Sequence, residues 1–163
     1  MRGCGVIRLS KLADYGIVIM TNLARQPGRH HNAPEIAARS HIPQPMVSKI
    51  LKALARAGLL TSHRGAKGGY GLARPAEAIS VADVISALDG PIALTACIED
   101  GPGGCEIEAL CPARANWHRI NDAIRSALDD ISMAEMAQAI PLAFGPPLLG
   151  LRRGPPEKPF GTA

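Results

Sequence analysis

The chain has 163 residues, enough for one compact domain with short appendages, and only 3% of them are aromatic. A core built from Ala, Leu, Ile and Val favours closely packed helices, so we expect a mainly α-helical protein. No apolar run reaches the about 20 residues of a membrane span, and the N-terminus lacks the apolar core of a signal peptide, which predicts a cytoplasmic protein without membrane association.

Charge is distributed unevenly along the chain. Residues 1–80 contain 12 Lys and Arg against 3 acidic residues, whereas residues 81–163 contain 6 against 11. The first half therefore carries a net charge of +9 and the second half −5, within the total of +4. A basic half is typical of a surface that binds a polyanion, although a solvated face of Arg and Lys is also common.

The first predicted helix covers residues 11–26. Ser10 has the residue type of an N-cap, apolar and small residues recur at spacings of three and four, and Pro27-Gly28 ends the pattern. After an N-terminal extension of residues 1–8, this helix opens the domain that we expect over residues 9–91.

Two further helices are predicted close together, over residues 33–40 and 44–57, with a three-residue turn between them. Gly58 then occupies the position that follows a helix end. Two short helices joined by a tight turn, with a basic second helix, are typical of a helix-turn-helix. An ordinary αα-hairpin has the same outline, but the cations of the second helix favour the DNA-binding alternative.

A β-hairpin is predicted after these helices, with strands near residues 59–64 and 70–74 around a glycine-rich turn. A hairpin in this position is typical of the wing of a winged helix, and its Arg64 and Lys67 are suited to phosphate or minor-groove contact. We expect Gln44 and Ser48 to face base edges. The full predicted set of DNA contacts is Gln44, Ser48, Lys49, Lys52, Arg64, Lys67, Gly68, Gly69 and Tyr70.

Three of the four cysteines lie in the Gly- and Pro-rich segment that we expect to form a loop over residues 92–112. A helix over residues 81–89, with a capping box of Ser80 and Asp83, precedes this loop and ends at Gly90-Pro91. Structural disulfides are rare in the cytosol, so Cys97, Cys105 and Cys111 indicate metal binding or redox sensing.

A long amphipathic helix is predicted after the loop, and residues 113–139 hold it together with a short helix that begins at a Ser132–Glu135 capping box. Its apolar stripe can fold back onto the same domain or form a dimer, and a winged helix on twofold DNA favours the dimer. The stripe consists of Trp117, Ile120, Ile124, Leu128 and Ile131. Residues 140–163 have the Pro- and Gly-rich composition of a flexible tail.

Taken together, residues 8–16, 47–54, 58–60 and 64–70 and the three cysteines resemble the Rrf2-type winged-helix regulators. The likeness covers about residues 8–137 and is closest to the member that regulates the SUF iron–sulfur assembly system. It implies a homodimer that binds a pseudo-palindromic site in double-stranded DNA. It further implies a repressor of iron–sulfur assembly genes, with an iron–sulfur cluster on Cys97, Cys105 and Cys111; thiolates are soft ligands suited to such clusters.

The fourth cluster ligand is where the sequence departs from the family pattern. Arg114 stands where some members have a histidine, and a guanidinium does not ligate. The resemblance makes Asp14 of the partner subunit the first candidate and His118 the second. Without the family resemblance, Asp14 would be interpreted only as a carboxylate in the first turn of a helix, where it offsets the helix dipole.

Other functions remain open on the residues alone. Zinc held by the three cysteines and an Asp or His is one, although thiol spacings of eight and six residues are wider than those of common zinc sites. A cofactor-free thiol sensor is another. An enzyme is not expected, because the sequence has no C-x-x-C, no nucleophile–base arrangement and no phosphate-binding loop motif.

Overall fold

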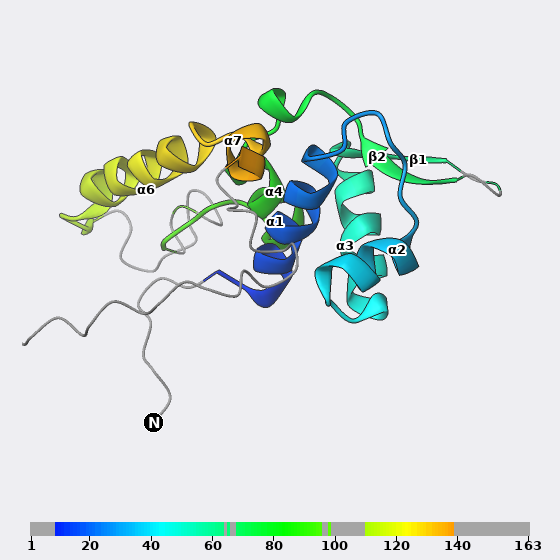
Figure 1. Ribbon diagram of the computed structural model, residues 1–163. Helices are drawn as coiled ribbons and strands as arrows, with labels where there is room; N and C mark the ends of the chain where they lie inside the picture. Colours follow the sequence, from blue (N-terminus) through cyan, green and yellow to red (C-terminus); the bar gives the residue numbers. More distant parts are fainter. Residues whose placement is uncertain (1–8, 64, 66–67, 96–97, 99–109, 139–163) are drawn as a thin grey trace, which may run out of the picture.

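The computed structural model describes residues 9–63, 65, 68–95, 98 and 110–138 (Figure 1). This part of the chain is mainly helical and contains a two-stranded antiparallel sheet. The elements in order are α1 (Lys11–Ala24), α2 (Ala33–Ser40), α3 (Gln44–Arg56), β1 (Leu60–His63), β2 (Gly69–Leu72), the 3₁₀ helix η1 (Ala76–Ala78), α4 (Val81–Asp89), α6 (Arg114–Asp129) and α7 (Met133–Gln138). The predicted winged-helix architecture of helices with a β-hairpin is confirmed.

Helix α1 lies at the centre of the core and packs against α2, α3, α4 and α7. It begins where predicted, because the Ser10 hydroxyl oxygen accepts hydrogen bonds from the backbone N–H groups of Leu12 and Ala13 at 3.1 and 3.0 Å. Ile19 and Met20 on its inner face have no solvent exposure. A Cβ at Gly16 would meet Leu88 of α4, so the absence of a side chain there permits the close approach of the two helices.

Helices α4 and α7 are brought together by the chain that leads into each of them. The capping box at the start of α4 is present as predicted: the Ser80 hydroxyl accepts from Asp83 N at 3.0 Å and the Asp83 carboxylate accepts from Ser80 N at 3.1 Å. An isolated bridge joins Ser80 to Ser132, with Met133 N donating to the Ile79 carbonyl at 2.8 Å. This pairing carries the Met133 side chain into the core, where it is fully buried.

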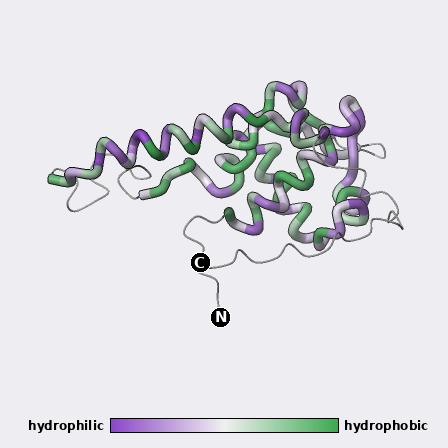
Figure 2. Tube along the Cα trace, turned by 60° about the vertical axis from the view of Figure 1, so that its left-hand side comes forward, coloured by the Kyte–Doolittle hydropathy of each residue, from purple (hydrophilic) through white to green (hydrophobic). Residues whose placement is uncertain are grey.

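Helix α6 extends away from the rest of the fold as an arm (Figures 1 and 2). Asn121 is its only buried residue, while Trp117 and Ile120 are 39% and 45% exposed. Ile124 and Leu128 are half-buried. The predicted apolar stripe is therefore only partly covered by its own domain. No helix formed by the described residues is both long and apolar enough to cross a membrane.

Candidate nucleic-acid interface and cysteine region

Helices α2 and α3 form the helix-turn-helix. Helix α2 begins at an N-cap, where the Asn32 side-chain oxygen accepts from Glu35 N at 2.8 Å. It ends at His41, which adopts the left-handed conformation with φ of 57°. The turn is anchored by Ile42, whose side chain is 6% exposed, and α3 follows directly after Pro43.

Helix α3 divides into a buried apolar face and an exposed basic face. Val47, Ile50, Leu51 and Leu54 are fully buried, and their spacing is that of one face of a helix. Gln44, Lys49 and Lys52 are exposed and Ser48 is half-buried. The first turn holds no acidic residue, and none of the ion pairs among the described residues involves a side chain of α3. This face is thus free to meet an anionic partner.

The wing is the antiparallel pair of β1 and β2, in which Leu60 lies opposite Leu72 and His63 lies opposite Gly69. Gly68, Gly69 and Tyr70 are half-buried at the start of the returning strand. Arg64 and Lys67 lie outside the described residues, so their predicted phosphate contacts stay predictions.

A third segment joins the wing, and we did not predict it from the sequence. His31 N donates to the Tyr70 carbonyl at 3.0 Å, and Tyr70 N donates to the His31 carbonyl at 2.9 Å. A Cβ at Gly69 would lie 2.7 Å from the His31 carbonyl group. Glycine in a short strand was the available signal, because it marks places where another backbone comes close.

The His31 side chain is 1% exposed and points to the first turn of α2. Its Nδ1 lies 2.9 Å from Glu35 Oε1, which also accepts from Arg29 Nη2 at 3.0 Å. The hydrogen bond from His31 lowers the pKa of Glu35, and the nearby guanidinium groups of Arg29 and Arg39 act in the same direction, against the opposing effect of burial. Glu35 is therefore held as a carboxylate at the junction of helix-turn-helix and wing.

Only one of the three cysteines proposed as ligands falls in the described residues. Cys111 is half-buried just before α6, and its carbonyl accepts from Arg114 N at 3.3 Å. Cys97 and Cys105 lie outside the described residues. His118 is half-buried within α6, and Asp14 is exposed in the first turn of α1. Within the described ranges, no three His, Cys, Asp or Glu side chains gather as a metal site, so the predicted ligand set stays a prediction.

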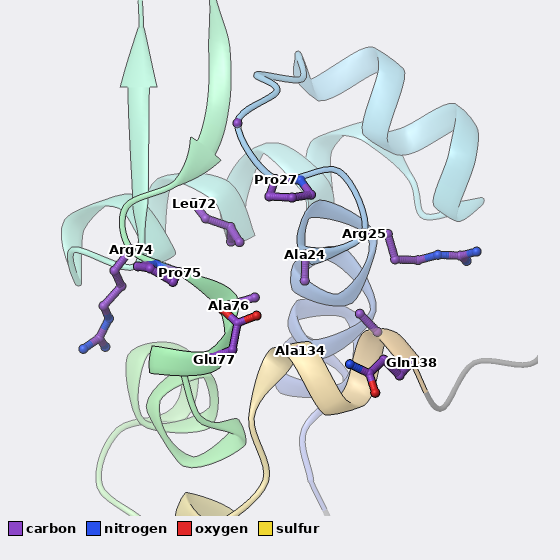
Figure 3. A pocket seen from close by; sticks show the side chains of 12 residues that line it. Ala24, Arg25, Pro27, Leu72, Arg74, Pro75, Ala76, Glu77, Ala134 and Gln138 are labelled. Carbon is purple, nitrogen blue, oxygen red and sulfur yellow. The ribbon is translucent and has the colours of Figure 1, made fainter.

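A cavity of about 570 Å³ lies away from both regions, between the end of α1, the end of β2, η1 and α7 (Figure 3). Its walls are largely apolar and include Ala24, Leu72 and Ala134. The side chains of Arg25 and Arg74 extend away from it. Its described lining includes none of the residues predicted to bind DNA or metal.

Comparison with known proteins gives consistent matches over most of the chain. A family model described as Rrf2, iron-dependent transcriptional regulator, matches residues 9–139. The transcriptional regulator CymR of Bacillus subtilis is 32% identical over 133 residues, which cover 80% of this chain and 90% of the relative. The transcriptional regulator IscR of Escherichia coli O1:K1 is 30% identical over 131 residues, or 80% of each chain.

Solved structures of Rrf2-type regulators superpose on this chain as well. CymR, the global cysteine regulator of B. subtilis, superposes with a TM-score of 0.68 at 31% identity, covering 83% of this chain and 99% of the other. IscR of T. potens superposes with a TM-score of 0.62 at 28% identity, covering 81% and 87%. Each superposition covers more of this chain than the winged helix alone. The likeness therefore extends into the C-terminal helices.

Proposed function

Since this chain belongs to the Rrf2 family of DNA-binding transcriptional regulators, which are not enzymes, we propose that it represses iron–sulfur cluster assembly genes as a homodimer. The operator is a pseudo-palindrome in double-stranded DNA. The signal is the presence or loss of an iron–sulfur cluster on Cys97, Cys105 and Cys111.

The observation that carries the DNA-binding part is the basic face of α3. A helix that is buried on one side, and on the other offers Lys49 and Lys52 with no carboxylate partner among the described residues, fits the major groove. In this proposal Gln44 and Ser48, in the N-terminal part of the helix, reach base edges. The lysines further along the helix reach phosphates, which fix position and carry no sequence information.

The dimer is supported by the partly uncovered apolar stripe that runs along α6 and ends at Ile131, just beyond the helix. Trp117, Ile120 and Ile131 are 39%, 45% and 41% exposed, which leaves large apolar side chains in water unless a second copy covers them. A twofold pair of α6 helices would set the separation of the two α3 helices. In a dimer of this kind that separation decides which half-site spacing fits.

The cluster is supported by the chemistry of the donors. Three thiolates within one short segment suit an iron–sulfur cluster, and Cys111 stands directly before the dimer helix. The three thiolates would hold the cluster, and oxidants or iron shortage would remove it. Loss of the cluster would change the position of Cys111, which transmits this change to α6. The fourth ligand would be Asp14 of the partner subunit or His118. Two states with different affinity for DNA are what an allosteric regulator requires.

A second candidate function is a thiol sensor without a cofactor. It is favoured by the likeness to a cysteine regulator and to the oxidized form of Staphylococcus aureus CymR, which superposes with a TM-score of 0.61 at 31% identity. In that case oxidation joins two of the cysteines. The carbonyl contact of Cys111 at the start of α6 carries the change to the dimer in the same way.

Anaerobic purification followed by iron, sulfide and zinc analysis separates these candidates. We expect iron and sulfide in the wild type, their loss in Cys111→Ser, and partial loss in Asp14→Ala rather than in His118→Ala. Zinc in place of iron, or no metal with a disulfide that controls DNA release, would overturn the cluster proposal.

DNA titrations over a range of salt concentrations test the assigned contacts. We expect Arg64→Ala and Lys67→Ala to weaken binding to all sequences and to reduce the salt slope by about one unit per lost phosphate contact. Gln44→Ala and Ser48→Ala should instead change the sequence preference. Arg125→Gln is the matched control, because it removes an exposed cation of α6 that pairs with Asp129 at 3.7 Å. Equal losses in both sets would contradict the division of roles.

A further inference from the structure

His31 stands at the point where three parts of the fold meet. It is the residue before the N-cap of α2, and its backbone pairs with Tyr70 of the wing through two hydrogen bonds of 3.0 and 2.9 Å. Its side chain, 1% exposed, reaches Glu35 of α2 at 2.9 Å. A polar side chain this deeply buried requires a reason, because leaving water is unfavourable unless the group is well bonded.

The direction of the side-chain bond follows from its partner. Glu35 is a carboxylate and can only accept, so the proton lies on His31 Nδ1. Nε2 of the same ring is buried and has no hydrogen-bond partner among the described residues. One of the two ring nitrogens thus makes the link to α2, while the backbone of the same residue makes the link to the wing.

Two neighbouring contacts close the same junction. Gly69 has no side chain where a Cβ would collide with the His31 backbone, so β2 lies directly against residue 31. The rings of His30 and His63 meet edge to face with centroids 4.5 Å apart, which brings β1 to the same segment. Both strands of the wing therefore contact residues 30–31, and residue 31 is bonded to α2.

We propose that His31 is a positioning residue that fastens the wing to the helix-turn-helix, so that the wing and α3 meet DNA as one rigid surface. Helix α2 packs on α3, the His31 side chain donates to Glu35 of α2, and the His31 backbone pairs with Tyr70 of the wing. The role in DNA recognition rests on the proposed function. The fastening itself is a property of the free protein.

Substitution at His31 separates the hydrogen bond from the bulk of the ring. His31→Asn keeps an N–H donor at nearly the place of Nδ1, because in both side chains that nitrogen is attached to Cγ. His31→Ala removes it. His41→Asn is the matched control, since His41 is an exposed imidazole in a left-handed position that Asn tolerates.

Amide hydrogen exchange of the free protein gives the first readout. We expect the amides of His31 and Tyr70 to exchange at least about tenfold faster in His31→Ala than in the wild type, while buried amides of α3 keep their rates. His31→Asn should restore protection, and His41→Asn should leave it unchanged. If His31→Ala does not fold, Glu35→Ala removes the acceptor from a partly exposed position and should give the same local acceleration.

DNA titration gives the second readout, which a purely structural role would not produce. In His31→Ala the slope of log binding constant against log salt concentration should fall by about one unit for each wing phosphate contact that is lost. The preference among operator sequences should be retained. Unchanged exchange and an unchanged salt slope would overturn the proposal. A wild type that does not bind operator DNA would refute the proposed function, and the exchange experiment would still decide whether His31 fastens the wing.

Discussion

Asn121 offers a sharp test of how the arm-like helix α6 is attached. Its side-chain oxygen accepts from Leu94 N at 3.2 Å, and its amide nitrogen donates to the Ile92 carbonyl at 3.0 Å. It is 5% exposed and lies at the segment that leads into the cysteine region. Asn121→Ala removes both bonds and leaves two half-buried backbone groups without this partner.

The loss of stability expected for Asn121→Ala follows from the number of hydrogen bonds it removes. A neutral hydrogen bond contributes about 0.5–1.5 kcal/mol net, so two should lower the free energy of unfolding by about 1–3 kcal/mol. Alanine is the better helix former and returns up to about 0.7 kcal/mol. Asn116→Ala, at an exposed position of the same helix, gains the same propensity and loses neither bond. The difference between the two variants therefore isolates the two hydrogen bonds.

Urea denaturation at one fixed protein concentration measures this difference, since a dimer's stability depends on concentration. We expect Asn121→Ala to be less stable than Asn116→Ala by about 1–3 kcal/mol, with faster exchange of the Leu94 amide. Equal stability of the two variants would show that Asn121 does not attach α6 in this way.

Other features give further predictions. Ser80→Ala should lower the free energy of unfolding by about 0.5–2 kcal/mol in urea denaturation, because it removes the cap of α4. If the chain forms the proposed dimer, Ile120→Lys should convert it to a monomer in light scattering, since Ile120 is 45% exposed on the proposed dimer face. Hydrogen bonds from the backbone and hydroxyl of Ser132 lower the pKa of Glu135. Thermal melts should therefore show a stability advantage over Glu135→Gln above the ordinary glutamate pKa, lost as the pH falls through the lowered pKa.

Local features of the fold were predictable from the sequence because each depends on neighbouring residues. The caps at Ser10, Ser80 and Ser132 are bonds within three residues of a helix start, and all three are present. The apolar face of α3 follows from a helical period in the same way. Strands β1 and β2 were also expected, since a short glycine-rich sequence separates two strand-like runs.

Contacts between distant segments were not predictable in this way. The bridge of His31 to Tyr70 involves one residue on each side, too few to produce an alternating pattern. Asn121 resembled any polar residue on the solvated side of an amphipathic helix, because its partners are backbone groups nearly 30 residues earlier in the chain. Residue type alone carries no information about such partners.

The candidate site also has a part that depends on neighbouring residues and a part that depends on distant ones. The basic face of α3 could be read from the sequence, since it is the complement of the buried stripe. The place of the cysteines could not, because the geometry of the proposed ligands depends on how the segment before α6, α6 itself and the proposed second subunit come together. Asp14 shows this most clearly: its exposure in the first turn of α1 agrees both with a dipole-offsetting carboxylate and with a ligand for the partner.

The central claim is that cluster occupancy controls operator binding, and one titration tests it directly. Anaerobically purified protein is titrated against labelled operator DNA at constant salt, before and after a chelator removes its iron, with iron and sulfide measured in each sample. We predict a change in the dissociation constant of at least about tenfold, within the usual range of allosteric coupling, and no change in Cys111→Ser. Iron-loaded and iron-free protein that bind the operator equally would contradict the claim.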